Sequence, residues 1–312
     1  MSDREGLLGR DILSVADLSP QELATVLELA RSLKKGGGPS LAGRLLVLLF
    51  EKPSLRTRLS FEVAMRSLGG ECLYFSPQEV GLGKREPVRD VARVLERHAH
   101  CIAVRTFAQE TVEEMARWAS VPVINALSDH EHPTQALADL LTVLEAKGRL
   151  AGVTLAFVGD GNNVARSLCL GAAMLGLHFR IASPEGYELP PGLVERARRY
   201  AEASGGSVRL FRRPEEAVAG ADVVYTDVWT SMGQEAEAEE RRRAFAGYQV
   251  DGRLLSLAAA DAIFMHDLPA HRGEEVTEEV IEGARSVVFQ QAENKTHAIR
   301  ALLALLLAGE GA

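Results

Sequence analysis

Residues 44–50 read RLLVLLF, and residues 51–58, directly after them, read EKPSLRTR. A continuous apolar run of this length is typical of a β-strand that is buried on both faces, as in a parallel sheet covered by helices. The polar segment leads into a pattern with helical spacing at residues 59–68, which stops at Gly69. These residues therefore predict a strand whose carboxyl end opens into a helix, the repeating unit of an α/β fold.

The same alternation continues along the chain and restarts near residue 148. Further strands are expected at residues 72–75, 101–105, 121–125, 154–159, 179–182, 208–211, 222–226, 263–266 and 287–289. Helices are expected at residues 20–33, 87–98, 111–119, 133–147, 164–175, 193–203 and 294–307. Such an order implies parallel strands joined by right-handed crossovers. The sequence therefore predicts two doubly wound parallel-sheet α/β domains, residues 1–147 and 148–290, linked by helices.

Composition excludes one broad class of protein. Of the 312 residues, 46% are hydrophobic and 25% are charged, which is ordinary for a globular protein. The 35 basic and 43 acidic residues give a net charge of −8, which argues against a nucleic-acid-binding protein held by a broad basic face. A few local cations could still form a pocket for a small anionic substrate.

The cysteines and the apolar runs indicate the cellular compartment of the protein. Cys72, Cys101 and Cys169 are odd in number and lack C-x-x-C spacing, so they predict neither a disulfide scaffold nor a zinc site. The N-terminal segment MSDREGLLGRD lacks the apolar region of a signal peptide. The apolar runs at residues 45–50 and 301–308 are too short to span a bilayer. We therefore expect a cytoplasmic protein without a membrane partner.

Polar residues stand at the ends of the expected strands of the first domain, where ligands bind in open α/β sheets. Residues 51–58 place hydroxyl, amide and guanidinium groups at a helix N-terminus, which suits a phosphate or a carboxylate, although an N-capped helix with solvated arginines has the same pattern. Arg105 and Asn125 end the next two strands, and His132 lies in the following loop. The spacing of His130 and His132 before a proline, without a nearby cysteine or third histidine, fits a metal site poorly.

The second domain carries three polar strand ends of the same kind. Residues 159–163, GDGNN, start like a dinucleotide fingerprint, but Val164 stands where the third glycine belongs, so a turn that serves another ligand fits at least as well. Residues 227–233, DVWTSMG, form either a binding loop or a loop anchored by its tryptophan. Residues 266–270, HDLPA, carry an ionisable pair beside a proline. The charge-rich residues 235–243 are expected to form a solvated face.

Taken together, these segments resemble one family, the aspartate/ornithine transcarbamoylases. The matching motifs are SLRTR (54–58), GKREP (83–87), Arg105, HPTQ (132–135), GNN (161–163), DVWTSMG (227–233) and H-x-L-P (266–269). The first is similar to the S-x-R-T-R carbamoyl-phosphate signature of the family, and the GKREP, GNN and DVWTSMG motifs suggest its ornithine branch. The resemblance extends from about residue 50 to residue 297. It implies a transcarbamoylase-like fold in which the C-terminal helix, residues 291–312, packs back on the first domain.

The resemblance also implies a reaction and a set of site residues. The reaction is transfer of the carbamoyl group of carbamoyl phosphate to the δ-amine of L-ornithine, which gives L-citrulline and phosphate, as in arginine biosynthesis. The implied carbamoyl-phosphate contacts are Ser54, Leu55, Arg56, Thr57, Arg105, His132, Gln135, Leu268 and Lys295. The implied ornithine contacts are Asn163, Asp227, Ser231 and Met232, and the implied catalytic residues are Arg105, His132 and Asp267. The first domain would hold carbamoyl phosphate and the second ornithine.

The same resemblance bears on cofactors and partners. Because carbamoyl phosphate is already activated, the reaction needs no metal ion and no organic cofactor. Members of the family are typically trimers or multiples of trimers, so we expect a homo-oligomer. Nucleic acid and membrane are not expected as partners.

Two residues depart from the pattern of the family. Asp267 stands where the family usually has the cysteine of an H-C-L-P segment, and Lys295 stands where it usually has arginine. The Asp267 carboxylate could accept the proton of the attacking amine, or could hold the ammonium form and raise the pH optimum. Lys295 keeps the positive charge but loses the bidentate fork of a guanidinium group.

Three other functions remain open on the sequence. A sister transcarbamoylase would act on aspartate, putrescine or an N-acylornithine, although the Ser231-Met232-Gly233 loop argues against aspartate and Asn163 would have little to bind in putrescine. A catalytically silent relative is disfavoured because the expected carbamoyl-phosphate residues are intact. A dinucleotide-binding oxidoreductase is disfavoured by the broken glycine pattern.

Overall fold

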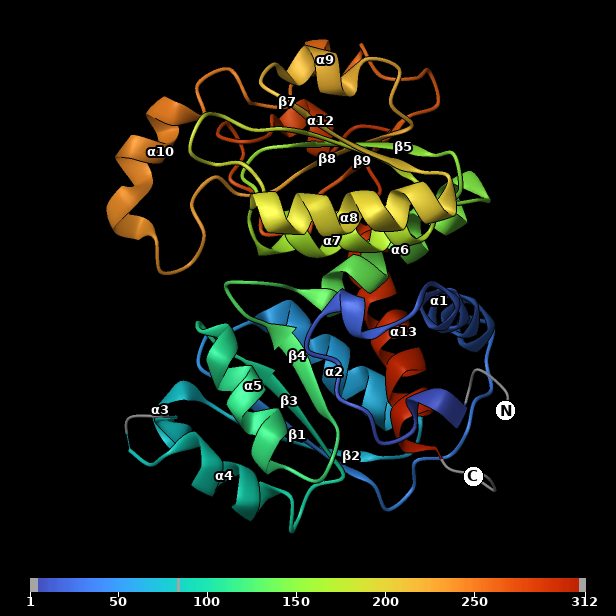
Figure 1. Ribbon diagram of the computed structural model, residues 1–312, viewed down its shortest axis with the longest axis vertical. Coiled ribbons are helices and arrows are strands. Elements are labelled where there is room, and N and C mark those ends of the chain that lie inside the picture. Colours follow the sequence, from blue (N-terminus) through green and yellow to red (C-terminus); the bar gives the residue numbers. More distant parts are fainter. Residues whose placement is uncertain (1–4, 83–84, 309–312) are drawn as a thin grey trace. The chain divides into compact units, whose positions relative to one another are not determined.

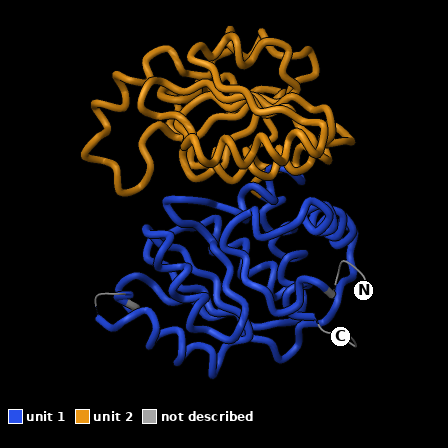
Figure 2. Tube along the Cα trace, viewed as in Figure 1, with its two compact units in different colours: residues 1–141, 293–312 blue, residues 142–292 orange. Residues whose placement is uncertain are grey.

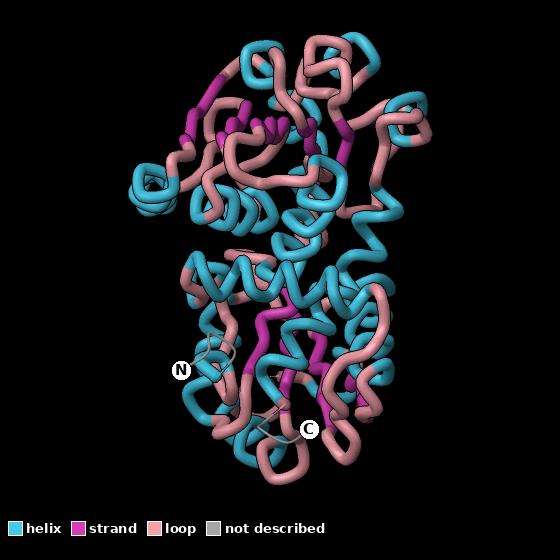
Figure 3. The backbone as a smooth tube through the Cα atoms, turned by 90° about the vertical axis from the view of Figure 1, so that its right-hand side faces the viewer, coloured by secondary structure: helices cyan, strands magenta, loops and turns pink. Residues whose placement is uncertain are grey.

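The computed structural model describes residues 5–82 and 85–308, which fall into two compact units (Figure 2). The first unit comprises the residues up to Leu141 together with those from Glu293 onward, and the second comprises Thr142–Ala292. Within each unit the strands lie between helices (Figure 3). The predicted class, two parallel-sheet α/β units connected by helices, is confirmed. Gly83 and Lys84 of the predicted GKREP motif lie outside the described residues.

The first unit contains a parallel sheet with the strand order β2-β1-β3-β4. Its strands are β1 (Leu45–Phe50), β2 (Glu71–Phe75), β3 (Cys101–Arg105) and β4 (Val123–Leu127). Its helices are α1 (Pro20–Lys34), α2 (Leu55–Ser67), α3 (Pro77–Val80), α4 (Val88–Leu95) and α5 (Gln109–Trp118), with short 3₁₀ turns at Glu5–Leu7 and Val15–Asp17. Figure 1 shows α4 and α5 on one side of the sheet and α2 on the other.

Strand β1 is apolar throughout because both of its faces are covered. Val47 and Leu49 pack in one buried cluster with residues of α4 and α5. Leu46 and Leu48, which alternate with them along the strand, point to the opposite face and are equally buried. The apolar run that predicts a two-sided strand is thus explained by the helices on each side.

The second unit contains a parallel sheet with the order β7-β6-β5-β8-β9. Its strands are β5 (Thr154–Val158), β6 (His178–Ala182), β7 (Ser207–Phe211), β8 (Val223–Thr226) and β9 (Ile263–Met265). Its helices are α7 (Asn163–Met174), α8 (Pro191–Ser204), α9 (Pro214–Val218), α10 (Ala238–Ala244), α11 (Gly252–Leu255) and α12 (Glu278–Ile281), with a 3₁₀ turn at Glu235–Glu237. Figure 1 shows α7 and α8 on one face of this sheet and α9 and α12 on the other.

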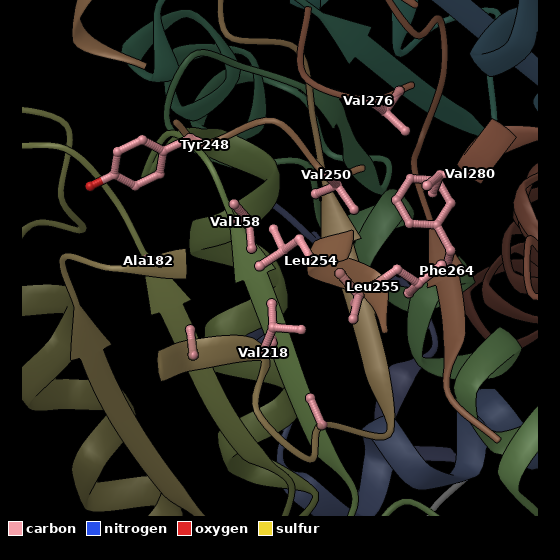
Figure 4. Packing of buried hydrophobic residues seen from close by; sticks show 14 of the residues in the cluster. Val158, Ala182, Val218, Tyr248, Val250, Leu254, Leu255, Phe264, Val276 and Val280 are labelled. Carbon is pink, nitrogen blue, oxygen red and sulfur yellow. The ribbon is translucent and has the colours of Figure 1, made fainter. Parts of the chain in front are cut away.

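A buried apolar cluster packs between this sheet and the helices α9 and α12 on one of its faces (Figure 4). Val158 and Ala182 contribute from the strands, Val218 from α9 and Leu254 from α11, and Phe264 of β9 is fully buried among them. This packing fixes β5, β8 and β9 relative to one another. The polar residues that follow these three strands therefore extend from a rigid base.

Two helices belong to both units along the chain. They are α6 (Pro133–Lys147) and α13 (Val288–Leu307). The predicted return of the C-terminal helix to the first domain is confirmed, since the part of α13 from Glu293 onward belongs to the first unit and Asn294 Oδ1 accepts a hydrogen bond of 2.8 Å from Lys34 Nζ of α1. Of the helices within residues 5–82 and 85–308, none is long and apolar enough to cross a membrane.

The strand predicted at residues 287–289 is wrong. Ser286 forms only an isolated bridge to Phe264, and Val287 N–H donates to the Phe264 carbonyl at 3.0 Å. The chain then enters α13 at Val288. An apolar stretch of this length has no periodicity that separates a strand from the first turn of a buried helix.

Candidate active site

In the first unit, the predicted residues gather where the direction of the strand order reverses, between β1 and β3. Phe50, the last residue of β1, lies opposite Arg105, the last residue of β3. Such a switch point leaves a crevice at the carboxyl ends of the strands, where ligands of open α/β sheets bind. The sheet therefore brings together the two predicted segments at residues 51–58 and 105.

The N-terminus of α2 has the chemistry of an anion site. Ser54 is its N-cap, and the Ser54 hydroxyl accepts a hydrogen bond of 3.3 Å from the Thr57 N–H. The first turn carries no acidic side chain. Arg105 Nη1 donates to Thr57 Oγ1 at 3.5 Å, which directs a guanidinium group from β3 toward this helix end. The partial positive charge of a helix N-terminus and an adjacent arginine together favour a phosphate group.

His132 is buried near two cations, Lys295 and Arg105. It is only 2% exposed, and its Nε2 lies 3.5 Å from Nζ of Lys295, which reaches it from α13. Burial, and after it the positive charges of Lys295 and Arg105, hold the pKa of His132 well below its usual value of 6.5. The imidazole is therefore neutral at physiological pH and can donate one N–H without bringing a charge of its own.

Gln135, in the first turn of α6, offers an acceptor to a ligand. Its Nε2 donates to Asp139 Oδ1 at 2.7 Å, and this carboxylate fixes which end of the amide is the donor. The Gln135 Oε1 atom is buried and has no hydrogen-bond partner among the described residues. A buried carbonyl oxygen in this condition suits a ligand that donates N–H groups.

In the second unit, the switch point lies between β5 and β8. Asn162 caps α7, because its Oδ1 accepts a hydrogen bond of 3.0 Å from Ala165 N–H, and its Nδ2 donates to Asp227 Oδ2 at 2.7 Å. Asn163, the first residue of α7, is half-buried at the same turn. Gly161 is required there, since a Cβ atom would lie 2.5 Å from the backbone of Glu188. The predicted contacts do not include Asn162, although its N-cap position is a signal that reveals it.

The segment after β9 is held by a buried contact between a histidine ring and a carboxyl group. His266 Nε2 lies 3.1 Å from Glu275 Oε1, and His266 Nδ1 accepts a hydrogen bond of 2.9 Å from Leu268 N–H. The Leu268–Pro269 peptide bond is cis and Leu268 has a φ of 58°. These contacts shape the turn that carries Asp267 and Leu268.

Asp227, His266 and Asp267 have ligand atoms within 4.8 Å of one another, as a metal site would. Both ring nitrogens of His266 are already engaged, since Nδ1 accepts from a backbone N–H and Nε2 faces the Glu275 carboxylate. The cluster thus offers a metal ion only the two aspartates. This donor set fits a metal centre poorly.

The loop that follows β8 is anchored by Arg241, and the prediction that residues 235–243 form a solvated face is wrong at this position. Arg241 is 6% exposed, and its Nη1 donates to Asp160 Oδ2 at 2.8 Å and to the Trp229 carbonyl at 3.0 Å. It thereby ties the loop to the end of β5. Within this loop, Ser231 is half-buried and Met232 is 47% exposed, so both are accessible to a ligand.

The predicted site residues divide between the two units. Ser54, Leu55, Arg56, Thr57, Arg105, His132, Gln135 and Lys295 belong to the first unit, and Asn163, Asp227, Ser231, Met232, Asp267 and Leu268 belong to the second. Leu55 is 77% exposed, so only its backbone is suited to a role in the anion site.

Comparison with known proteins covers nearly the whole chain. The carbamoyl-phosphate-binding domain of the aspartate/ornithine carbamoyltransferase family matches residues 10–145, and the aspartate/ornithine-binding domain matches residues 151–306. The ornithine carbamoyltransferase of Hyperthermus butylicus is 55% identical over 309 residues, which cover 97% of this chain and 98% of the relative. That of Acidothermus cellulolyticus is 53% identical over 305 residues, with coverages of 97% and 98%.

Solved structures agree with these relatives. The ornithine carbamoyltransferase from Pyrococcus furiosus matches with a TM-score of 0.94 and 50% sequence identity, over 97% of this chain and 98% of that chain. The crystal structure of the enzyme from Thermus thermophilus matches with a TM-score of 0.87 and 51% identity, over 96% and 99%.

Proposed function

This chain belongs to the aspartate/ornithine carbamoyltransferase family, and from that premise we propose that it transfers the carbamoyl group of carbamoyl phosphate to the δ-amine of L-ornithine. The products are L-citrulline and phosphate, a step of arginine biosynthesis. The observation that carries this function is identity above 50% with ornithine carbamoyltransferases over 97% of the chain. The residue roles below extend that assignment to the site.

The first domain, predicted as residues 1–147 with 291–312, holds carbamoyl phosphate in this proposal. The N–H groups at the start of α2 and the Arg56 and Arg105 guanidinium groups bind the phosphate, and the Ser54 and Thr57 hydroxyls complete the cradle. Gln135 Oε1 accepts from the carbamoyl NH₂ group. The unpartnered, buried state of that oxygen supports this role.

His132 and Thr57 polarise the carbamoyl carbonyl. As the amine attacks, negative charge grows on the carbonyl oxygen, and donors fixed in a buried site stabilise it without reorganisation. A neutral His132 donates a hydrogen bond there and keeps its proton. Arg105 and Lys295 supply the positive charge, and the bond between the carbonyl carbon and the phosphate oxygen then breaks.

The second domain, predicted as residues 148–290, holds ornithine. Asn163 and the Met232 backbone bind its carboxylate, Asp227 binds its α-ammonium and Ser231 assists. The Leu268 carbonyl accepts from the carbamoyl NH₂ group or from the attacking amine. The hydrogen bond from Asn162 orients Asp227 for this contact.

The attacking δ-amine must be neutral. With a reference pKa of about 10.4, deprotonation near pH 7 costs roughly 4–5 kcal/mol. Asp267, which stands beside Asp227, is the residue proposed to accept this proton. No cofactor enters the scheme, because carbamoyl phosphate is a mixed anhydride that is already activated.

A homotrimer, or a multiple of trimers, is the proposed assembly. Leu55, Leu59 and Val63 form an apolar stripe along the outer side of α2, with exposed fractions of 77%, 55% and 44%. Leu73 on the neighbouring edge strand β2 is 49% exposed. Contiguous exposed apolar side chains of this kind favour cover by another copy of the chain.

A cytoplasmic location is the remaining part of the proposal. All three cysteines are free thiols, and Cys101 and Cys169 are buried. Free cysteines are typical of proteins that work in a reducing compartment.

The test of the proposed function is an amine panel with the purified enzyme. Citrulline formation, or carbamoylation of the alternative amine, is measured with carbamoyl phosphate and either L-ornithine, putrescine, L-aspartate or N-acetylornithine. We expect turnover with ornithine, and values of kcat/KM for the other amines at least about 100-fold lower, because an unpaired carboxylate or ammonium site forfeits a charged hydrogen bond. Turnover with another amine but not with ornithine would contradict the assignment.

A further inference from the structure

The register of the second sheet brings two carboxyl groups together. Strands β8 and β9 are neighbours, and Tyr225 lies opposite Met265. Asp227 and Asp267 each come two residues later, so they leave the same edge of the sheet side by side. A carboxyl oxygen of each lies within 4.8 Å of a carboxyl oxygen of the other. Asp227 is 6% exposed and the side chain of Asp267 is 15% exposed.

The groups that face this pair do not neutralise two negative charges. Asp227 accepts hydrogen bonds of 2.7 Å from Asn162 Nδ2, before α7, and from its neighbouring Val228 N–H. His266 Nδ1 lies 3.6 Å from Asp267 Oδ1, but that nitrogen already accepts the Leu268 N–H and has no proton to give.

The charged residues near this pair form hydrogen bonds and ion pairs with other groups. The other nitrogen of His266 faces the Glu275 carboxylate, and Arg241 is bonded to Asp160 and Glu237. Within the described part of the chain, no lysine or arginine forms an ion pair with either Asp227 or Asp267. Asp267 Oδ1 is a buried atom without a hydrogen-bond partner there.

Two carboxylates this close together in a poorly solvated site repel each other, and one shared proton removes the repulsion. Burial, followed by the charge of Asp267, raises the pKa of Asp227 well above its usual 3.8. Both the geometry and the electrostatics thus favour a pair that carries a single negative charge.

We propose that Asp227 and Asp267 share one proton before ornithine binds, and that the α-ammonium group of ornithine expels this proton to solvent when it docks. The inference rests on the proposed function, because it takes Asp227 as the partner of that ammonium group. Only one O–H bond is broken, and the proton goes to water. The ammonium group takes the place of the proton. The two carboxylates therefore carry a net charge of minus one together with the proton before binding, and the same net charge together with the ammonium group after binding.

This exchange has a consequence for catalysis. A pair that already holds a proton cannot accept another one from the δ-amine. Once the α-ammonium has displaced the shared proton, the Asp267 carboxylate is ionised and can receive the proton of the attacking amine. Ornithine thereby prepares its own proton acceptor, and a cysteine at position 267 would form no such pair.

The test is calorimetric and uses L-norvaline, which is ornithine without the δ-amine. Norvaline is titrated into enzyme saturated with carbamoyl phosphate near pH 7, in two buffers of different ionisation enthalpy, so that the difference in heat counts the protons released. We expect about one proton released per norvaline bound by the parent and clearly less than that by Asp267→Asn, in which burial still raises the pKa of Asp227 but the neighbouring negative charge is gone. The affinity of the parent should rise about tenfold per pH unit below the pKa of the pair.

Asp261→Asn is the matched control. Asp261 is an exposed aspartate of the same unit, and its hydrogen bond and ion pair with Lys147 hold its pKa below the usual 3.8, so it carries no proton to release. This variant should release the same proton as the parent. Equal heats in both buffers for the parent, or the same proton release from Asp267→Asn as from the parent, would overturn the proposal.

Two further outcomes distinguish a failure of the proposed function from a failure of the shared-proton proposal. If the parent makes no citrulline and binds no norvaline, the proposed function fails and the inference fails with it. If the parent is active but Asp267→Asn and Asp267→Cys bind no norvaline, infrared spectra of the parent decide the question. A carboxylic-acid C=O band that disappears on norvaline binding supports the shared proton, and the absence of that band from the free enzyme overturns it.

Discussion

Replacement of Arg56 by alanine is expected to lower kcat/KM for carbamoyl phosphate by about 10²–10³-fold and to leave the melting temperature nearly unchanged. Arg56 lies in the first turn of α2, at the helix end proposed to hold the phosphate. Its side chain is half-buried and forms no hydrogen bond or ion pair with the described residues. The native fold therefore loses no hydrogen bond or ion pair when the guanidinium group is removed, whereas the bound phosphate loses a charged donor.

Arg66→Ala is the matched control for this prediction. Arg66 lies in the last turn of the same helix, and its side chain is 67% exposed. Within the described part of the chain its only ion pair, at 3.8 Å, is with Glu62, so its loss should leave both kcat/KM and the melting temperature unchanged. Steady-state kinetics and thermal melts of the two variants decide the matter. Nearly full activity of Arg56→Ala would show that the phosphate binds elsewhere.

Replacement of His132 by alanine is expected to reduce kcat by about 10²–10³-fold, because the developing oxyanion loses a preorganised donor. Burial, and after it the two nearby cations, hold the pKa of His132 well below 6.5, so the parent does not charge this group between about pH 6 and pH 8. The pH profile of the variant should therefore parallel that of the parent over that range, at a lower level. Rates measured at a series of pH values check both parts.

His130→Ala serves as the control for His132. His130 is exposed and lies two residues away in the same loop. Its loss should leave kcat unchanged, whereas a metal site built on both histidines would lose activity in either variant. If the His132 variant lost a kinetic ionisation near pH 6–7 that the parent shows, a neutral role for His132 would be contradicted.

The ends of the strands could be predicted because polar residues follow each apolar run. Residues 54–58 and Arg105 are visible in this way, and the reversal of strand order between β1 and β3 then brings them together. The same reasoning finds Asp227 after β8. Local pattern therefore predicts the fold class and the edge of the sheet at which the ligands are proposed to bind.

The remaining features depend on pairing between distant segments. Asp227 and Asp267 are adjacent because β8 and β9 pair in one particular register, and no local pattern encodes that register. Arg241 looks like one of several surface arginines, yet it is buried because Asp160 lies within its reach at the end of β5. Tertiary packing decides these cases, and the helical start at Val288 is another.

The central claim is that one unit holds carbamoyl phosphate at the start of α2 while the other holds ornithine at the ends of β5 and β8. Its most direct test is a crystal structure with a bisubstrate analogue that joins a phosphonate to ornithine. The account predicts the phosphonate on the Ser54–Thr57 backbone with Arg56 and Arg105, and the ornithine ammonium on Asp227. A phosphonate bound anywhere else on the chain would contradict it.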